Sequence, residues 1–396
     1  MFPLTLFKNA HILAPQDLGR QDLLIAGQQI IAMGQDFNFT SSQIPVHLVD
    51  ASDYYLTPGL VDSLVHFIGG GGEGGFASRT PEMMLTDATL GGVTTAIGVL
   101  GTDATTRTLT NLLAKAHALS QEGISTWCHT GSYEIPCRTL LGSIQDDLIL
   151  IDKFIGVGEI AISDHRSSQP TIPELRKIAA SARVGGMLAG KRGIVSVHVG
   201  SGASLLDPLH HAVHGTELTL GQFYPTHINR NKELLSAGIE FAKAGGVIDF
   251  TTSTTHYDLQ HGEVAAAGAL AQALAAGVPP QQLTMSSDGN ASLPIFASDG
   301  QLIGLEVGQV RTLWQSARSA VMDWQVPLVS ALSAVTSSPA KVLGLSQKGQ
   351  IQVGLDADLL LIRCDDLQID SVYAKGRLMI ENGQPVVWGT FETKSR

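Results

Sequence analysis

The feature that most constrains this 396-residue chain is an alternation, repeated eight times between about Thr57 and Leu345, of short apolar runs with Ala/Leu-rich segments. Short runs bounded by Gly are typical of buried parallel strands, and the intervening segments have helical composition. Eight βα repeats predict a (β/α)8 TIM barrel rather than an open sheet. The predicted strands are 59–67, 93–100, 125–131, 156–163, 193–200, 223–228, 247–251 and 283–287. Helices are expected over 109–119, 172–188, 234–244 and 265–276.

The two ends of the chain carry a different pattern. Short β-like runs separated by Gly or Asp occur near both ends, which predicts one small β-sandwich built from the N- and C-terminal segments. The expected strands are 2–7, 23–31 broken at Gly27, and 46–49 near the start, and 349–354, 357–362 and 372–380 near the end. We therefore expect residues 1–56 and 346–396 to form a small β domain and residues 57–345 to form the barrel.

Charge and cysteine usage narrow the class of protein. Twenty-five basic and 36 acidic residues give a net charge of −11, which disfavours nucleic acid or an anionic membrane as a partner. The sequence contains no uninterrupted run of eighteen apolar residues, so no membrane-spanning helix is predicted. Cys128, Cys137 and Cys364 lie far apart without a CxxC spacing, so neither a disulfide framework nor a cysteine zinc site is indicated. The N-terminus lacks an export signal, and we expect a cytoplasmic protein.

Five apolar runs each end at a residue able to bind a divalent metal, namely His66, Glu159, His198, His227 and Asp288. Imidazole and carboxylate are the ligands of catalytic zinc, and the carboxyl ends of barrel strands meet at one rim. His198 and His227 follow consecutive strands about 5 Å apart, so their rings can share one ion. Two buried structural histidines are the alternative, but the matched placement with Asp288 favours a metal-dependent enzyme.

Asp288 stands in the string Ser-Ser-Asp-Gly-Asn after the eighth predicted strand. An aspartate before glycine can simply cap a loop. Beside a metal-activated water, however, a carboxylate can accept a proton and pass it to a departing amine. We expect Asp288 to be the general acid/base as well as a metal ligand.

Together these residues resemble the amidohydrolase superfamily and, more closely, its isoaspartyl dipeptidases. The resemblance covers nearly the whole chain. Its matching strings are GGGGE at 69–73, LGTD at 100–103, TGSY at 130–133, ISDHRS at 162–167, PTHINRN at 225–231 and SSDGN at 286–290. It implies hydrolysis of a β-linked aspartyl dipeptide by metal-activated water, and a large homo-oligomer, with an octamer as the family's example.

The resemblance also implies the residues that bind the substrate. Glu73 would receive the free ammonium, with a further hydrogen bond from Thr102. Arg166 and Arg230 offer planar guanidinium groups to the two carboxylates, with help from Ser292. An isoaspartyl dipeptide displays one amine and two carboxylates, which suits this set.

Tyr133 occupies the position at which the family keeps a tyrosine that polarises the scissile carbonyl. A phenol donor there acts like one member of an oxyanion hole. By residue type alone, half-buried packing of Tyr133 and a local ion pair between Arg166 and Asp164 are the commoner arrangements. The matching strings favour the functional roles.

Two departures from the family concern the metal. The family's first strand carries His-x-His, where this chain has Leu64-Val65-His66, and the lysine of its fourth strand is replaced by Glu159. The glutamate side chain is too short to reproduce the bridge that a carboxylated lysine makes between two metals. We therefore predict one tightly bound Zn²⁺ on Glu159, His198 and His227, with a second ion weak or absent near His66 and Asp288.

These departures leave two alternative functions open. Some superfamily deacetylases have a strand-four glutamate and a broken His-x-His, so an N-acyl amino acid or amino-sugar deacetylase is the enzymatic alternative. A catalytically inactive oligomeric scaffold is the other. His256 and His261, in the loop after the seventh predicted strand, could belong to a substrate lid, supply a substitute ligand or lie in an ordinary loop.

Overall fold

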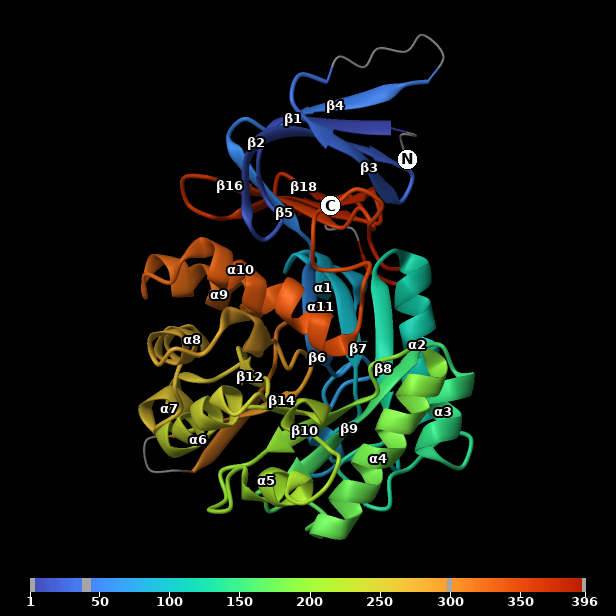
Figure 1. Cartoon of the computed structure of the whole chain (residues 1–396), viewed down its shortest axis with the longest axis vertical. Coiled ribbons are helices and arrows are strands. Elements are labelled where there is room, and N and C mark those ends of the chain that lie inside the picture. The colour runs from blue at the N-terminus through green and yellow to red at the C-terminus, as the bar shows by residue number, and fades with distance from the viewer. Residues whose placement is uncertain (1–3, 38–43, 298–300, 394–396) are drawn as a thin grey trace.

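A computed structural model describes residues 4–37, 44–297 and 301–393 of the chain. Residues 2 and 3 of the first expected strand lie outside this part. Figure 1 shows a sheet built from both chain ends at one end of the molecule, with a larger unit of parallel strands and surrounding helices beneath it.

The larger unit is built on parallel strands that coincide with the eight predicted ones. Within the described residues, six of them pair in the order β11-β10-β9-β8-β7-β6, and β12 pairs with β13. Their bounds are β6 Leu60–Val65, β7 Val93–Gly98, β8 Ser125–Thr130, β9 Phe154–Ile162, β10 Ile194–Val199, β11 Phe223–Thr226, β12 Ile248–Thr251 and β13 Leu283–Ser286. The eight runs of buried apolar residues were thus sufficient to locate the strands.

Backbone hydrogen bonds curl this parallel sheet. The amide of Ile228, just after β11, donates to the Asp249 carbonyl of β12 at 3.1 Å. Beyond β13, the Asp288 amide donates to the Leu64 carbonyl of β6 at 3.1 Å, and the His66 amide donates to Gly289 at 2.9 Å. The first and last strands therefore meet where His66 and Asp288 lie.

The four predicted helices are present, and the chain marks their ends. Asn231 accepts a hydrogen bond from the Leu234 amide at 2.7 Å and starts α6, while Thr171 starts α4 through a capping box with Glu174. The helices are α1 Leu85–Thr89, α2 Leu109–Glu122, α3 Ile144–Leu150, α4 Ile172–Ala189, α5 Asp207–Val213, α6 Lys232–Lys243, α7 His256–Gln260, α8 Ala266–Ala275, α9 Thr312–Met322, α10 Leu328–Val335 and α11 Ser337–Leu343. In the described ranges, no helix has the length and apolar character needed to cross a bilayer.

Both chain ends join one sheet, as the sequence predicted. Its order is β19-β18-β17-β16-β5-β1-β2-β3, and β4 pairs with β1. The strands are β1 Leu4–Leu13, β2 Asp17–Ala26, β3 Gln29–Gly34, β4 Val46–Asp50, β5 Tyr54–Pro58, β16 Leu359–Arg363, β17 Ile369–Ala374, β18 Arg377–Glu381 and β19 Gln384–Pro385. Phe7 of β1 packs edge-on against Tyr373 of β17 at 5.0 Å between ring centroids, so the two ends share one apolar core.

The break expected at Gly27 in the run 23–31 is present: Gly27 has a left-handed φ of 56°, and β2 and β3 form a hairpin across it. Two other strand predictions for the chain ends need correction. The run 372–380 is not one strand but turns at Lys375-Gly376. Residues 349–354 form no strand and are held as a turn, in which the Gly354 amide donates to Ile30 at 2.8 Å. Apolar alternation does not reveal where a positive φ reverses the chain.

A hairpin not expected from the sequence follows β13. Its strands are β14 Ser292–Phe296 and β15 Leu302–Val307, paired antiparallel with Ser292 opposite Val307. Leu293, Pro294 and Leu305 of this hairpin line the cavity described next.

Candidate active site

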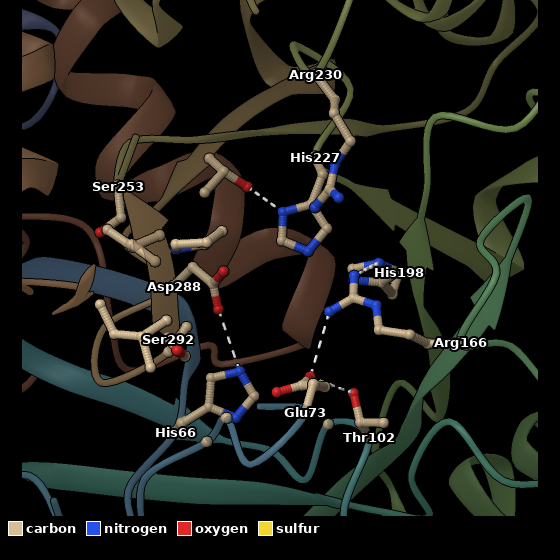
Figure 2. Close-up of a pocket in the computed structure, with 18 of the residues that line it drawn as sticks. His66, Glu73, Thr102, Arg166, His198, His227, Arg230, Ser253, Asp288 and Ser292 are labelled. Carbon is tan, nitrogen blue, oxygen red and sulfur yellow. Dashed lines mark hydrogen bonds and ion pairs between the residues drawn. The ribbon is translucent and has the colours of Figure 1, made fainter. Parts of the chain in front are cut away.

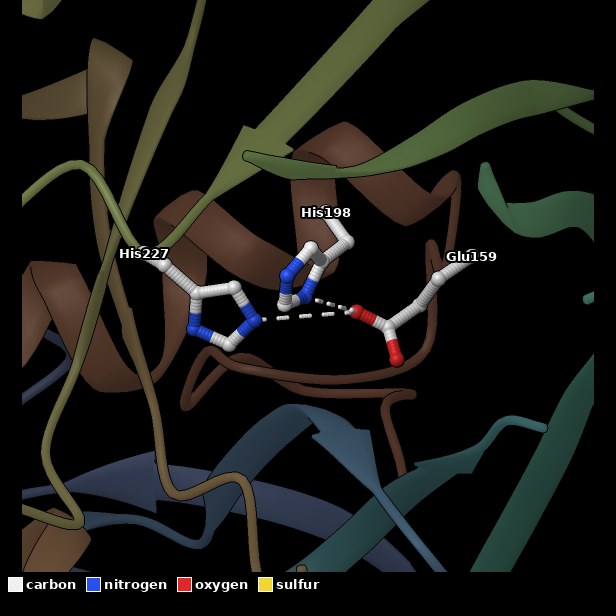
Figure 3. Close-up of side chains that lie close together, drawn as sticks. All are labelled: Glu159, His198 and His227. Atoms are coloured by element: carbon white, nitrogen blue, oxygen red, sulfur yellow. Dashed lines mark ion pairs between the residues drawn. The ribbon is translucent and has the colours of Figure 1, made fainter. Parts of the chain in front are cut away.

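A cavity of about 640 Å³ lies at the carboxyl ends of the parallel strands. Ten of the eleven predicted site residues line it: His66, Glu73, Thr102, Tyr133, Arg166, His198, His227, Arg230, Asp288 and Ser292. Figure 2 shows how these side chains, Tyr133 apart, converge from separate strands and loops. The eleventh, Glu159, is buried and faces the imidazoles of His198 and His227 (Figure 3). The structure thus brings the whole predicted set together.

The deepest part of the site consists of Glu159, His198 and His227, which we call the floor. Their ligand atoms all lie within 4.8 Å of one another. The Oε1 atom of Glu159 is 3.7 Å from Nδ1 of His198 and 3.7 Å from Nε2 of His227. Within the described residues, this is the group of His, Cys, Asp and Glu whose arrangement suits a metal ion.

The two imidazoles of the floor are held by contacts on their far sides. Nε2 of His198 is 2.8 Å from Oδ2 of Asp164, and Nδ1 of His227 meets the hydroxyl of Thr251. Each contact turns the other ring nitrogen toward Glu159, as outer contacts of metal-binding histidines do. Thr251 did not stand out in the sequence, and Asp164 was noted only as a partner of Arg166.

The floor fits a divalent ion. Both Glu159 oxygens are buried without a hydrogen-bond partner among the described residues, and 3.7 Å is too long for a hydrogen bond. Ligands about 2.0–2.2 Å from a tetrahedral zinc are themselves roughly 3.4 Å apart, close to the spacing found here. A cation would therefore satisfy a carboxylate that has no other partner.

The pKa values of the floor agree with this assignment. Burial raises the pKa of Glu159, but the imidazoles of His198 and His227 outweigh burial and hold that pKa below its usual range. Burial, reinforced by the neighbouring His198, lowers the pKa of His227 to about 4. Glu159 is therefore ionised and His227 neutral near pH 7, which are the forms that bind metal.

His66 and Asp288 form a pair at the edge of the floor. Nε2 of His66 is 3.2 Å from Oδ1 of Asp288 and 3.8 Å from Oε2 of Glu159. Burial opposes charge on both groups, but each stabilises the charged form of the other, so the pKa of His66 is raised and that of Asp288 lowered. Leu64, where the family has its other histidine, is a buried apolar residue.

Tyr133 is buried beside the floor. Its hydroxyl lies 2.5 Å from Nδ1 of His198, and since Nε2 of that ring faces Asp164, the phenol is the donor. Burial raises the pKa of Tyr133 well above its usual value, so the phenol stays protonated.

One side of the cavity mouth carries Glu73, Thr102 and Arg166. Thr102 donates to Oε1 of Glu73 at 2.9 Å, and Nη1 of Arg166 approaches the same oxygen at 3.4 Å (Figure 2). The other nitrogens of Arg166 bind Asp164, with Nη2 2.9 Å from Oδ2. The predicted ammonium receptor and one predicted carboxylate receptor thus partner each other.

Arg230 lies across the site from Glu73 and Thr102 (Figure 2). It follows His227 by three residues, beyond β11, and lines the cavity. Ser292 lies against the glycine-rich loop, where a Cβ on Gly71 would come within 2.7 Å of the Ser292 Cβ. A side chain at position 71 would therefore displace Ser292.

The two loop histidines differ from each other. His261 is exposed, lines the cavity and stacks on Tyr257 with 3.7 Å between ring centroids. His256 pairs instead with Gln260 at 2.8 Å and is absent from the cavity lining. Neither joins the metal-binding group found among the described residues.

Comparison with known proteins identifies the family of this chain. Residues 55–379 match the amidohydrolase family. The β-aspartyl dipeptidase of Fervidobacterium islandicum AW-1, solved with a β-Asp-Leu dipeptide, is 42% identical with a TM-score of 0.88, over 96% of this chain and 98% of that one.

Two more distant structures share the fold alone. Dihydropyrimidinase from Brevibacillus agri NCHU1002 is 16% identical, with a TM-score of 0.69 over 98% of this chain and 97% of that one. N-acetylglucosamine-6-phosphate deacetylase from Pasteurella multocida is also 16% identical, with a TM-score of 0.61 over 96% and 100%. The resemblance predicted from the sequence is thus confirmed: the chain is a hydrolytic enzyme that belongs to the amidohydrolase family.

Proposed function

We propose that this enzyme hydrolyses β-aspartyl dipeptides with one zinc ion held by Glu159, His198 and His227. The observation that carries the proposal is the presence, in one cavity, of a buried metal-binding floor and of charged groups on both sides of it. The related dipeptidase that was solved with β-Asp-Leu supports the same substrate class.

The mouth of the cavity matches the charges of such a substrate. The ammonium binds Glu73 and Thr102, and the aspartyl α-carboxylate binds Arg166, so the substrate replaces the long 3.4 Å contact between Glu73 and Arg166. The carboxylate of the second residue binds Arg230, with Ser292 assisting. The scissile bond then lies above the floor.

The chemical step uses Asp288 and Tyr133. A bound divalent ion supplies Lewis-acid activation of the attacking water. Asp288, whose lowered pKa keeps it a carboxylate, takes a proton from that water as the new C–O bond forms. The Tyr133 hydroxyl, displaced from Nδ1 of His198 by a cation bound at that nitrogen, is freed to donate to the carbonyl oxygen as negative charge develops there. Asp288 then passes its proton to the nitrogen of the second residue as the C–N bond breaks.

We infer that a second metal ion is weak or absent. The position of the family's other histidine is occupied by the apolar Leu64, and His66 is already paired with Asp288. Two ligands hold an ion less tightly than the three of the floor.

The finer description of the fold is also a proposal. The hydrogen bonds between β11 and β12 and between β13 and β6 support a closed (β/α)8 barrel over residues 57–345. The shared core of β1 and β17 supports a sheet folded over itself as a β-sandwich, made of residues 1–56 and 346–396.

We further propose a homo-oligomer in the cytoplasm. Large apolar side chains are exposed on α3 and α4, including Leu150 at 69%, Met187 at 70% and Leu188 at 70%. Burial of such a patch against another copy would stabilise an assembly. A reducing compartment suits the three free cysteines.

A direct assay tests the function. Purified enzyme is incubated with β-Asp-Leu and with α-Asp-Leu, with and without a chelator, while bound metal is measured per chain. We expect cleavage of the β-linked dipeptide alone, abolished by the chelator, with about one zinc per chain. Cleavage of neither dipeptide by zinc-loaded enzyme would contradict the proposal and favour the deacetylase or scaffold alternative.

A further inference from the structure

The loop between β12 and α8 forms the cavity wall near Arg230. Three of its titratable side chains, Asp258, His261 and Glu263, line the cavity. The sequence drew attention to His261 in this loop, and the mechanism above uses none of the three.

Hydrogen bonds fix Glu263 close to Arg230. The Val264 amide donates to the Asn229 carbonyl at 2.8 Å, and Nδ2 of Asn229 donates back to the Val264 carbonyl at 2.9 Å. Asn229 immediately precedes Arg230, and Val264 immediately follows Glu263. These two bonds therefore hold Glu263 and Arg230 at the same corner of the cavity.

The two carboxylates of this wall are in different states. Oδ2 of Asp258 accepts the Thr255 hydroxyl at 2.6 Å and serves the cap of α7. Glu263 is half-buried and has no ion pair with any basic residue in the described ranges. Burial, reinforced by the charges of Asp258 and Asp288, raises the pKa of Glu263 to about 7, although the Thr254 hydroxyl and Arg230 act in the opposite direction. A cationic group in the cavity would satisfy it.

An apolar surface lines the same cavity. Leu293, Pro294 and Leu305 of the β14–β15 hairpin contribute to it. Lysine and arginine side chains combine a long apolar stem with a charged end, so they match an apolar wall that lies in one cavity with a carboxylate. These three apolar side chains would contact the methylene groups of a lysine or arginine in the substrate, and Glu263 would bind the charged end.

We propose that Glu263 selects β-aspartyl dipeptides whose second residue has a cationic side chain, lysine or arginine. Arg230 holds the carboxylate of that second residue, and Glu263, at the same corner, receives the end of its side chain. The inference rests on the proposed function and adds the identity of the second residue.

The test compares β-Asp-Lys with β-Asp-norleucine, which has lysine's length without its charge. In zinc-loaded wild-type enzyme we expect a higher kcat/KM for β-Asp-Lys. Glu263→Gln should lower the ratio of the two kcat/KM values about tenfold, the effect of a single partly buried charge interaction. Glu263→Lys should reverse the preference toward β-Asp-Glu.

A matched control separates local from global charge. Glu240→Gln removes one exposed carboxylate on α6 and changes the net charge by the same amount as Glu263→Gln. If the acidic net charge caused the preference for β-Asp-Lys, both variants would lower the ratio equally, whereas we expect Glu240→Gln to leave the ratio unchanged. Unfolding temperatures of both variants check that they fold.

Two failures are distinguishable. If no β-linked dipeptide is hydrolysed, the proposed function is wrong. If both dipeptides are hydrolysed with the same ratio in wild type and Glu263→Gln, the selectivity assigned to Glu263 is wrong and the proposed function stands.

Discussion

The floor and the mouth of the cavity are built in opposite ways. Glu159, His198 and His227 come from strands or strand ends and are only 1–3% exposed. Glu73 and Arg166 lie on loops, with 38% and 26% of their side chains exposed. The floor's carboxylate faces its neighbours without hydrogen bonds, whereas Glu73 and Arg166 already partner each other. Strands and strand ends thus position the candidate metal ligands, whereas loops position the candidate substrate-binding residues.

The two regions also differ in what a bound ligand would change. Burying a carboxylate without a partner costs free energy, so a bound cation would stabilise the floor. Charges at the mouth remain solvated and neutralise each other, so a substrate there only exchanges one set of contacts for another. Substitutions on the floor should therefore have larger effects than substitutions at the mouth.

The largest effect is expected for Glu159→Gln. Loss of the carboxylate should weaken zinc binding by at least about 100-fold, since even outer contacts to metal ligands are worth 10–100-fold. Zinc should raise the unfolding temperature of the wild type and of the exposed control Glu240→Gln, but not that of Glu159→Gln. Calorimetry with and without zinc checks this, and equal zinc affinity in all three proteins would remove Glu159 from the metal site.

Asp288→Asn tests the proton transfer proposed for Asp288, which lies between the floor and the mouth. We expect kcat to fall about 10²–10⁴-fold, because the amide cannot accept and return a proton. Bound zinc should persist on Glu159, His198 and His227. Near-normal turnover would remove Asp288 from proton transfer, and Asp366→Asn in an exposed loop serves as the control.

Arg230→Ala tests a residue at the mouth of the cavity. The expected change is a rise in KM of about 10–100-fold with a smaller change in kcat, as for lost charge-assisted binding of a carboxylate. Arg183→Ala, on the outer surface of α4, is the matched control. A fall in kcat at unchanged KM would instead assign Arg230 to the chemical step.

The smallest effect is expected for Thr102→Val. This change removes one exposed hydrogen bond to Glu73, worth about 1 kcal/mol, so KM should rise about fivefold. Zinc content should stay at the wild-type level. If Thr102→Val weakened zinc binding, the separation of mouth from floor would be wrong.

Much of this arrangement could be predicted from local sequence. Continuous apolar runs located the strands of the parallel sheet to within two residues, and the candidate metal ligands were visible because they lie in or just after such runs. The resemblance supplied the mouth residues. Local patterns carry this information because burial of a strand constrains every residue along it.

Contacts between distant segments could not be predicted in this way. Glu73 and Arg166 are 93 residues apart, and the contact of Thr251 with His227 depends on how β12 lies beside β11. The turn at Lys375-Gly376 and the β14–β15 hairpin were missed because apolar alternation does not mark chain reversals. No periodicity in the chain encodes these pairings.

Asp164 accepts hydrogen bonds from both His198 and Arg166, and this shared acceptor has a thermodynamic consequence. A carboxylate bound at Nη1 of Arg166 would act through the same guanidinium on Asp164, the acceptor that sets the tautomer of His198. We therefore expect occupancy of the two proposed sites to be linked, and such linkage is reciprocal: each ligand changes the affinity for the other by the same factor.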